Sequence, residues 1–320
     1  MASLLEVKSL CTSFFTEDGE VRAVDGVSFS VEAGKLMGLV GESGSGKTAA
    51  VLSIMRLLPE AARITGGEIL FEGTDLLKLG EPEMRAIRGA KSAIIFQEPM
   101  TSLNPVFTVG SQIGEAIRLH QRTTRHETRA RVIEAVRMVG IADPERRVDD
   151  YPHQLSGGMR QRVMIAMALA CNPKVLIADE PTTALDVTIQ AQILDLIREL
   201  QTRLGLAVIL VTHDLGIVAE YADDVTIVYS AHVMEQAPAA ELFRNPLNPY
   251  TRGLLESIPG IAGRPNRRLQ AIPGTIPSAL NPPEGCRFHP RCPIAIPQCA
   301  AAVPPLELKG PNHYVACIRV

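Results

Sequence analysis

Residues 41–48 read Gly-Glu-Ser-Gly-Ser-Gly-Lys-Thr, which meets every fixed position of the G-x-x-x-x-G-K-[ST] phosphate-binding loop. The apolar run Lys35–Val40 before it is typical of a buried strand. The segment Lys47–Leu58 after it has helical spacing and no helix breaker until Pro59. In such a strand–loop–helix, glycines let successive backbone N–H groups surround a phosphate at the helix N-terminus. The segment therefore predicts a nucleoside triphosphate site.

The loop residues have distinct predicted roles at that site. Lys47 is expected to reach the β- and γ-phosphates, and the Thr48 hydroxyl is a natural Mg²⁺ ligand. The residues expected to bind the nucleotide are Gly41, Ser43, Gly44, Ser45, Gly46, Lys47 and Thr48.

Beyond the loop, strand-like apolar runs alternate with helical segments through the first 245 residues. The predicted strands are Ala23–Val31, Lys35–Val40, Glu68–Phe71, Ala93–Phe96, Val175–Ala178, Ala207–Val211 and Val225–Tyr229. The predicted helices include Lys47–Leu58, Met159–Ala170, Thr188–Leu204 and Leu215–Tyr221. This alternation predicts an α/β fold with a largely parallel sheet and helices on both faces. Between Pro99 and Ser156 the strands stop, which indicates a helical insertion over about 99–158.

Composition argues against several classes of protein. A net charge of −3 gives no overall attraction to nucleic acid, and the absence of Trp leaves little aromatic surface for stacking bases. No apolar run approaches the roughly 20 residues needed to span a bilayer. The N-terminus lacks the pattern of a secretory signal. We therefore expect a cytoplasmic protein that binds no nucleic acid.

Two adjacent acids follow the apolar run Val175–Ala178, at the strand end where parallel sheets bind ligands. Asp179 is expected to organise Mg²⁺, and Glu180 to polarise the attacking water. Elsewhere, Ser156 is a good N-cap for the predicted helix from Met159. Gly157 and Gly158 expose N–H groups there, which predicts a second anion site.

These elements occur in an order that resembles the nucleotide-binding subunits of ATP-binding-cassette (ABC) transporters. After the loop comes Gln97 at a strand end, matching the Q-loop of that family, and then the signature Leu-Ser-Gly-Gly-Met-Arg-Gln at 155–161. The pair Asp179-Glu180 follows, then Ala184-Leu185-Asp186 as the D-loop and His213 as the switch histidine. The resemblance covers essentially residues 4–257.

The resemblance implies the P-loop ABC cassette fold, with a mixed sheet core and a helical subdomain insertion. It also implies an ATP-hydrolysing head-to-tail dimer. ATP on one chain's loop would contact Ser156, Gly157, Gly158 and Gln161 of the other chain's signature. His213 would contact the γ-phosphate, and Lys47 and Glu180 would be the other catalytic residues. Gln97 would join Thr48 and Asp179 at Mg²⁺. Adenine would stack on an N-terminal aromatic ring, and Phe14 is preferred over Phe15.

The sequence around the motifs further resembles that of the dipeptide/oligopeptide permease ATPases, as in YPHQLSGGM at 151–159 and GC at 285–286. That subfamily implies a second, related but non-identical ATPase chain, two transmembrane permease subunits and an extracytoplasmic peptide-binding protein. The chain would then act peripherally at the cytoplasmic face of the bacterial inner membrane. One departure is that Ala231 and Ala237 stand where the family commonly has glycine.

The composition changes from Ile258 onward, where 12 of the 23 prolines lie. We predict an ATPase domain at 1–257 and a small Pro/Cys-rich module at 258–320. The module contains Cys286, Cys292, Cys299 and Cys317, spaced C-x5-C-x6-C-x17-C. Four thiolates are able to hold zinc or an iron–sulfur cluster, with His289 and His313 as substitute zinc ligands. The spacing does not decide between them. Resemblance to the permease ATPases favours a 4Fe–4S cluster.

Alternative functions remain open from the sequence. Related importers carry nickel, glutathione or haem precursors rather than peptides. A non-transport ABC ATPase would be expected to have tandem cassettes or basic insertions, and neither is present. A degenerate cassette that only binds ATP would lack Glu180 or the signature, and both are intact.

Overall fold

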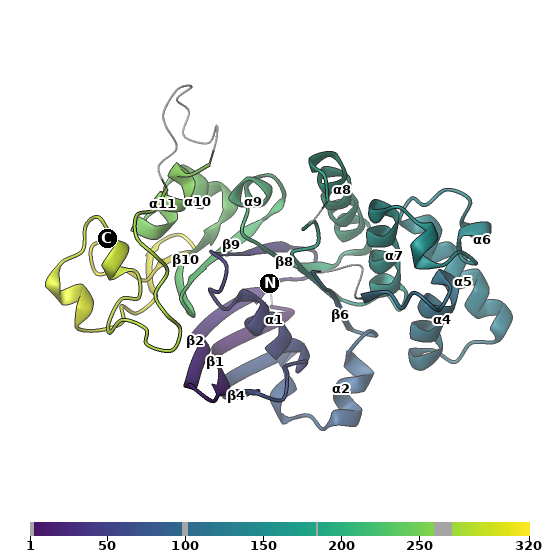
Figure 1. Ribbon diagram of the computed structural model, residues 1–320, viewed down its shortest axis with the longest axis horizontal. Helices are drawn as coiled ribbons and strands as arrows, with labels where there is room; N and C mark the ends of the chain where they lie inside the picture. Colours follow the sequence, from purple (N-terminus) through teal and green to yellow (C-terminus); the bar gives the residue numbers. More distant parts are fainter. Residues whose placement is uncertain (1–2, 98–101, 184, 259–270) are drawn as a thin grey trace. The chain divides into compact units, whose positions relative to one another are not determined.

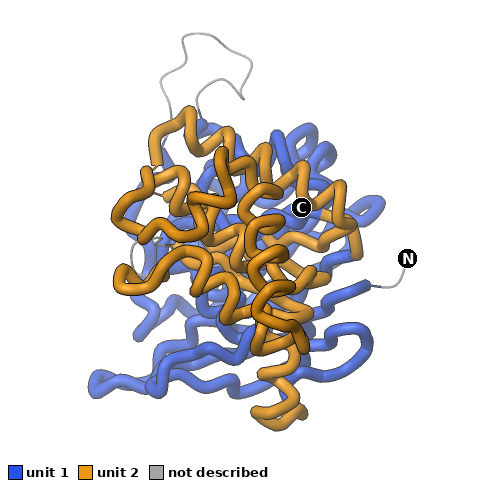
Figure 2. Tube along the Cα trace, turned by 90° about the vertical axis from the view of Figure 1, so that its right-hand side faces the viewer, with its two compact units in different colours: residues 1–32, 36–77, 210–320 blue, residues 33–35, 78–209 orange. Residues whose placement is uncertain are grey.

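The computed structural model describes residues 3–97, 102–183, 185–258 and 271–320. The predicted start of the helical insertion at 99, Ala184 of the D-loop and residues 259–270 of the extension lie outside these ranges. The chain divides into two compact units, coloured separately in Figure 2. Unit 1 comprises 1–32, 36–77 and 210–320, and unit 2 comprises 33–35 and 78–209.

Unit 1 contains the N-terminal sheet, the phosphate-loop helix and the C-terminal segment. Its strands are β1 (Leu5–Thr16), β2 (Gly19–Val31), β3 (Leu36–Val40), β4 (Ala62–Phe71), β5 (Thr74–Asp75), β9 (Asp224–Tyr229), β10 (His232–Pro238), β11 (Glu307–Gly310) and β12 (His313–Val315). Its helices are α1 (Lys47–Met55), α9 (Leu215–Tyr221), α10 (Ala239–Arg244), α11 (Pro249–Glu256) and the short 3₁₀ turns η3 (His289–Arg291) and η4 (Pro297–Ala300).

Unit 2 contains mostly helices. They are α2 (Glu81–Ile87), α4 (Val109–His120), α5 (Arg125–Met138), α6 (Pro144–Arg147), η2 (Pro152–Gln154), α7 (Gly157–Leu169) and α8 (Val187–Leu204). Its strands are β6 (Ser92–Ile95) and β7 (Val175–Asp179). Two elements, η1 (Leu76–Lys78) and β8 (Ala207–Thr212), cross the boundary between the units. In the described residues from 102 to 156 there is no strand, as predicted for the helical insertion.

The sheets are mixed, which corrects the expectation of a largely parallel sheet. Strands β2-β1-β4-β5 form an antiparallel sheet, and β2, β1 and β4 lie side by side in Figure 1. The remaining strands of unit 1 follow the order β11-β12-β10-β9-β3, and those of unit 2 include the neighbours β7-β6. The pairs β3/β9 and β6/β7 are parallel, whereas β9, β10, β12 and β11 pair antiparallel. The mixed sheet that the resemblance to the ABC cassette implies is therefore confirmed, whereas the largely parallel sheet predicted from the alternation is not.

Burial along their whole length explains the continuous apolar sequences of three strands. Every residue of β3, β7 and β8 is buried. In unit 1 the core extends from β3 through Tyr229 and Tyr250 to Phe288 of the C-terminal segment. Residues 271–320 thus pack into unit 1, and the division at 257 stays a prediction. No helix in the described part of the chain is long and apolar enough to cross a membrane.

Candidate active site

The phosphate-binding loop connects β3 to α1 in unit 1, as the sequence predicts. Gly46 has a φ of 100°, and a Cβ there would lie 2.0 Å from the Ala23 carbonyl oxygen. A Cβ on Gly41 would lie 2.1 Å from the carbonyl oxygen of Val228. Both positions therefore require glycine, because the backbone of neighbouring strands passes directly beside the loop.

Lys47 lies across the loop at the first residue of α1. Its ammonium donates hydrogen bonds to the carbonyl oxygens of Gly41 (2.8 Å) and Glu42 (3.0 Å), and the residue is buried. Thr48, the next residue of α1, is exposed. In the loop, Ser43 and Gly44 are also exposed, whereas Ser45 is buried. The structure therefore brings the predicted phosphate-binding residues of unit 1 together in one loop.

A hairpin turn supports this loop and contains the departure noted in the sequence. Ser230 (φ 43°) and Ala231 (φ 71°) both have left-handed backbones, which a turn of this kind imposes and which glycine adopts more easily. The Ala231 N–H donates to the Ser45 carbonyl (3.0 Å), and the Ala231 carbonyl accepts from Asp25 N–H (3.0 Å). The turn therefore adopts left-handed backbone angles at Ser230 and Ala231 without glycine.

Two of the predicted site residues, the catalytic Glu180 and the Mg²⁺ ligand Gln97, meet in unit 2. Parallel pairing of β6 with β7 places Ile95 opposite Ala178, so the segments after both strands emerge at the same edge. There the Gln97 amide donates to the Glu180 carboxylate (2.9 Å), and the Thr183 hydroxyl donates to the same oxygen (3.0 Å).

Glu180 also has a φ of 47°, a left-handed backbone conformation that is uncommon for residues other than glycine. Strained residues of this kind concentrate at functional sites, where the surroundings hold them. Asp179, the last residue of β7, is buried beside it. Asp179 is thus enclosed at the end of β7, while the Glu180 carboxylate is held by two hydrogen bonds.

The signature segment begins α7. The Ser156 side chain caps the helix by accepting from the Met159 N–H (3.3 Å), which confirms the predicted N-cap. Ser156 and Gly157 are exposed, whereas Gln161 is almost completely buried. Neither polar atom of the Gln161 side chain has a hydrogen-bond partner within the part of the chain that the structure describes. In this conformation Ser156 and Gly157 are therefore accessible to a ligand or a partner chain, whereas the Gln161 side chain is not.

The remaining candidates lie at element ends. Asp186 caps α8 by accepting from the Ile189 N–H (3.0 Å), and His213 is exposed in the segment between β8 and α9. Phe14 is half-buried in β1, opposite Val21 of β2. Phe15 is 47% exposed, so its ring is the more accessible of the two.

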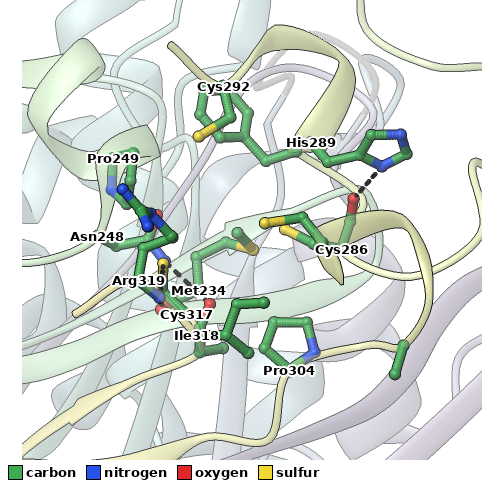
Figure 3. A pocket seen from close by; sticks show the side chains of 14 residues that line it. Met234, Asn248, Pro249, Cys286, His289, Cys292, Pro304, Cys317, Ile318 and Arg319 are labelled. Carbon is green, nitrogen blue, oxygen red and sulfur yellow. Dashed lines mark hydrogen bonds between the residues drawn. The ribbon is translucent and has the colours of Figure 1, made fainter. Parts of the chain in front are cut away.

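The four cysteines of the C-terminal segment line one cavity in unit 1 (Figure 3), and none forms a disulfide. Burial raises the pKa of Cys286 and Cys292, which favours the neutral thiol over the thiolate that binds metal. Within residues 3–97, 102–183, 185–258 and 271–320, no group of three His, Cys, Asp or Glu side chains is arranged to hold a metal ion. The cavity therefore supports neither the zinc nor the 4Fe–4S prediction by itself.

The two histidines considered as zinc ligands have other partners. The His313 ring pairs with the buried Glu235 carboxylate (Nε2 to Oε1, 2.7 Å), and His313 does not line the cysteine cavity. His289 lines the cavity, and its Nδ1 lies 2.9 Å from the Cys286 carbonyl oxygen.

A contact that the sequence did not predict joins the C-terminal segment to the phosphate loop. The Arg291 guanidinium pairs with both carboxylate oxygens of Glu42, at 2.8 and 3.1 Å. Burial disfavours the charged guanidinium, but its hydrogen bonds to Glu42 and Tyr229 outweigh that effect and raise the pKa of Arg291. Glu42 occupies a variable position of the loop motif and Arg291 lies 249 residues away, so no local pattern relates them.

Comparison with known proteins gives a consistent assignment along the chain. Residues 24–183 match the family model described as ABC transporter, and residues 234–299 match the model for the C-terminal region of oligopeptide/dipeptide transporters. A peptide ABC transporter ATP-binding protein of Sinorhizobium fredii is 53% identical over 99% of this chain and 95% of its own length. The dipeptide transport ATP-binding protein DppD of Escherichia coli is 48% identical over 98% of this chain and 96% of its own length.

Solved structures agree with these sequence relatives. The ATP-binding cassette MJ0796, in a dimeric post-hydrolysis state with ADP and phosphate, superimposes with a TM-score of 0.66 at 27% identity. That alignment covers 73% of this chain and 98% of the other. A second dimeric structure of the same cassette gives the same TM-score at 28% identity and the same coverage.

Proposed function

Because this chain belongs to the ABC transporter ATPases with an oligopeptide/dipeptide-type C-terminal region, we propose that it powers the import of dipeptides or oligopeptides. It is an ATP-hydrolysing subunit by family. The observation that carries the peptide assignment is the continuity of the likeness, because relatives named for peptide transport match almost the whole chain, including the C-terminal segment. The alternative cargo is another small solute such as nickel, glutathione or a haem precursor.

We propose the following roles for the loop residues of unit 1. The backbone N–H groups of Gly44 and Gly46 and the Lys47 ammonium bind phosphate oxygens, so that negative charge that develops at the γ-phosphate meets fixed donors. Phe14 contacts the adenine, with the more exposed Phe15 as the alternative. His213 contacts the γ-phosphate. Magnesium, when bound, neutralises phosphate charge, and Thr48 is its proposed ligand together with Gln97 and Asp179.

Glu180 is the proposed residue that orients and polarises the attacking water. The hydrogen bonds from Gln97 and Thr183 fix the direction of its carboxylate, so it needs little rearrangement before reaction. Gln97 would in turn report occupancy of the site to the helical insertion that follows it in the chain.

Changing Glu180 to Gln tests this role. The variant keeps the side chain's shape but loses its charge, so we expect Mg-ATP binding within about threefold of wild type and turnover reduced at least about a hundredfold. Thr183→Ala removes one hydrogen bond to the same carboxylate and serves as the matched control, with a loss of about tenfold or less. Wild-type turnover in the Glu180→Gln variant would contradict the assignment.

We propose that the working form pairs this chain head-to-tail with a second ABC ATPase, a related but non-identical chain. The partner's nucleotide would face the signature residues Ser156, Gly157 and Gly158 and the D-loop residue Asp186. Gln161 would support the signature from its buried position in α7. Two transmembrane permease subunits and an extracytoplasmic peptide-binding protein complete the importer, with this chain bound peripherally at the cytoplasmic face of the inner membrane.

The transport proposal has a direct test in vesicles. The chain, its partner ATPase and the permease subunits are reconstituted with the binding protein, and ATP-dependent uptake is measured for labelled di-, tri- and pentapeptides, nickel and glutathione. Uptake of peptides alone supports the proposal. Uptake of nickel or glutathione without peptides assigns the alternative cargo.

We keep the 4Fe–4S cluster as a separate proposal, because the resemblance to the permease ATPases favours it and Cys286, Cys292, Cys299 and Cys317 line one cavity. The four thiols would each bind one iron. Anaerobic purification should then give a protein with visible absorbance near about 400 nm and stoichiometric iron and sulfide. Stoichiometric zinc without iron, or neither metal, rules the cluster out.

A further inference from the structure

We propose that Arg291 is a positioning residue for the phosphate-binding loop: by pairing with Glu42 it fixes the loop and neutralises a carboxylate beside the triphosphate site. The C-terminal segment would therefore set the affinity of the loop for Mg-ATP. This inference rests on the proposed function, because it assigns a task to residues around the same loop.

The geometry of the pair is that of a specific clamp. Both terminal nitrogens of Arg291 donate to Glu42, one to each carboxylate oxygen, and the planar guanidinium matches this two-pronged contact in a way that Lys does not. Arg291 is 7% exposed and the Glu42 side chain 25%, so the arginine end of the pair is largely shielded from the solvent that weakens surface ion pairs.

The other donors of Arg291 are also occupied within unit 1. Its Nε donates to the Pro273 carbonyl (3.1 Å), and Nη1 donates to the Tyr229 hydroxyl as well (3.2 Å). The guanidinium carbon lies 5.7 Å from the Tyr229 ring centroid, within the range of a cation–π contact. These contacts hold the arginine in place independently of its pairing with the loop.

Glu42 is fixed at three points. Its side chain binds Arg291, its N–H donates to the Tyr250 hydroxyl (3.1 Å), and its carbonyl accepts from the Lys47 ammonium (3.0 Å). The same carbonyl also accepts from the Ser45 N–H (3.2 Å). Displacement of Glu42 would consequently move acceptors used by two residues of the loop.

Charge gives a second reason for the pair. Without Arg291, the Glu42 carboxylate would stand as an unpaired negative charge in a loop whose proposed ligand is a polyanion. Like charges at such distances repel by an amount that grows as solvent is excluded. The arginine thus removes a repulsion and fixes a backbone at the same time.

The C-terminal segment offers a matched control. Arg287 and Arg291 each neighbour a cavity cysteine in sequence, and each forms an ion pair with a carboxylate in the N-terminal part of unit 1. Arg287 pairs with Asp25 on β2 (3.4 Å) rather than with a residue of the phosphate loop. Loss of either pair weakens the attachment of the segment, but only loss of Arg291 exposes a charge in the loop.

The test measures dissociation constants for Mg-AMPPNP by calorimetry on the full chain. We expect Arg291→Gln to weaken binding about tenfold and Arg291→Lys by about threefold, because Lys keeps the charge but loses the two-pronged contact. The double variant Arg291→Gln/Glu42→Gln should return to within about threefold of wild type, since the unpaired carboxylate is gone. Arg287→Gln should lower the melting temperature without changing the dissociation constant.

Kinetics of the assembled ATPase provide a second measurement. Arg291→Gln should raise KM for ATP while kcat changes less than about twofold, because the loss concerns binding rather than the chemical step. An unchanged dissociation constant in folded Arg291→Gln overturns the inference, and so does a double variant as weak as the single one. If Arg291→Gln does not fold, an unchanged constant in Arg291→Lys overturns it instead. Failure of the wild-type chain to bind Mg-AMPPNP would contradict the proposed function, not this inference alone.

Discussion

The phosphate-binding loop and the cysteine cavity both belong to unit 1, yet they are built in opposite ways. The loop is eight consecutive residues whose shape depends on backbone angles and on close approach to β2 and β9. The cavity draws its cysteines from residues 286 to 317 and depends on turns and side-chain packing between them. A site formed by consecutive backbone residues can be identified, with its ligand, from the sequence. A site formed by scattered side chains reveals in the sequence only which side chains are available.

Substitution of Gly46 by Ala should give the largest effect and shows how far the loop depends on its backbone. The new Cβ would meet the Ala23 carbonyl at 2.0 Å at a φ of 100°, so the loop must shift. Strain of about 3 kcal/mol, relieved by displacement of the phosphate-binding N–H groups, corresponds to roughly a hundredfold weaker nucleotide binding. Calorimetry with Mg-AMPPNP measures it.

Gly26→Ala is the control for that experiment. Gly26 also has a positive φ (68°) in unit 1, but a Cβ there would have no atom within 4 Å. The variant therefore isolates the conformational cost from the clash, and its nucleotide affinity should stay within about twofold of wild type. Equal losses in both variants would mean that backbone strain alone, rather than contact with β2, sets the shape of the loop.

Substitution of Gly285 by Ala makes the corresponding change at the cavity and has the next largest effect. Its φ is 64°, and a Cβ would lie 2.4 Å from the Cys299 carbonyl, which accepts the Cys286 N–H. We expect a loss of roughly 2 to 4 kcal/mol in the free energy of unfolding, measured with urea. Nucleotide affinity should fall far less than in Gly46→Ala. A loss of affinity as large as that of Gly46→Ala would mean that the two regions act as one site.

The sequence predicted the loop, the carboxylate strand and the Ser156 cap because each depends on neighbours in the chain. Strands β7 and β8 were predicted to within one residue at their ends, since continuous apolar runs mark strands buried on both faces. Strand β1 was missed. Its pairing with β2 contains register irregularities, and it buries Thr12 and Ser13, which hides the alternation that identifies a strand.

Long-range contacts of polar side chains explain two features that the sequence left undetermined. Glu235 is fully buried in β10 and accepts from the Leu247 and Asn248 N–H groups while pairing with His313. A Glu within HVMEQAP argues against a central strand unless those partners are known. The Arg291–Glu42 pair is hidden for the same reason, because its two members gain meaning only when the C-terminal segment packs against the core.

The smallest predicted effect concerns pH and separates the cavity from the loop once more. Burial raises the pKa of Cys286 and Cys292, so the folded chain holds these thiol protons more tightly than the unfolded chain does. Their contribution to stability is full below the unfolded thiol pKa of about 8.5 and is lost as pH rises through the higher folded values. Urea unfolding of the metal-free protein between pH 7.5 and 10 should therefore show a steeper decline for wild type than for the Cys286→Ala/Cys292→Ala variant. Because Lys and Tyr titrations are common to both proteins, the difference between the two curves reports the thiols alone. Parallel curves would mean that the cavity admits enough water to leave both thiols at their ordinary pKa.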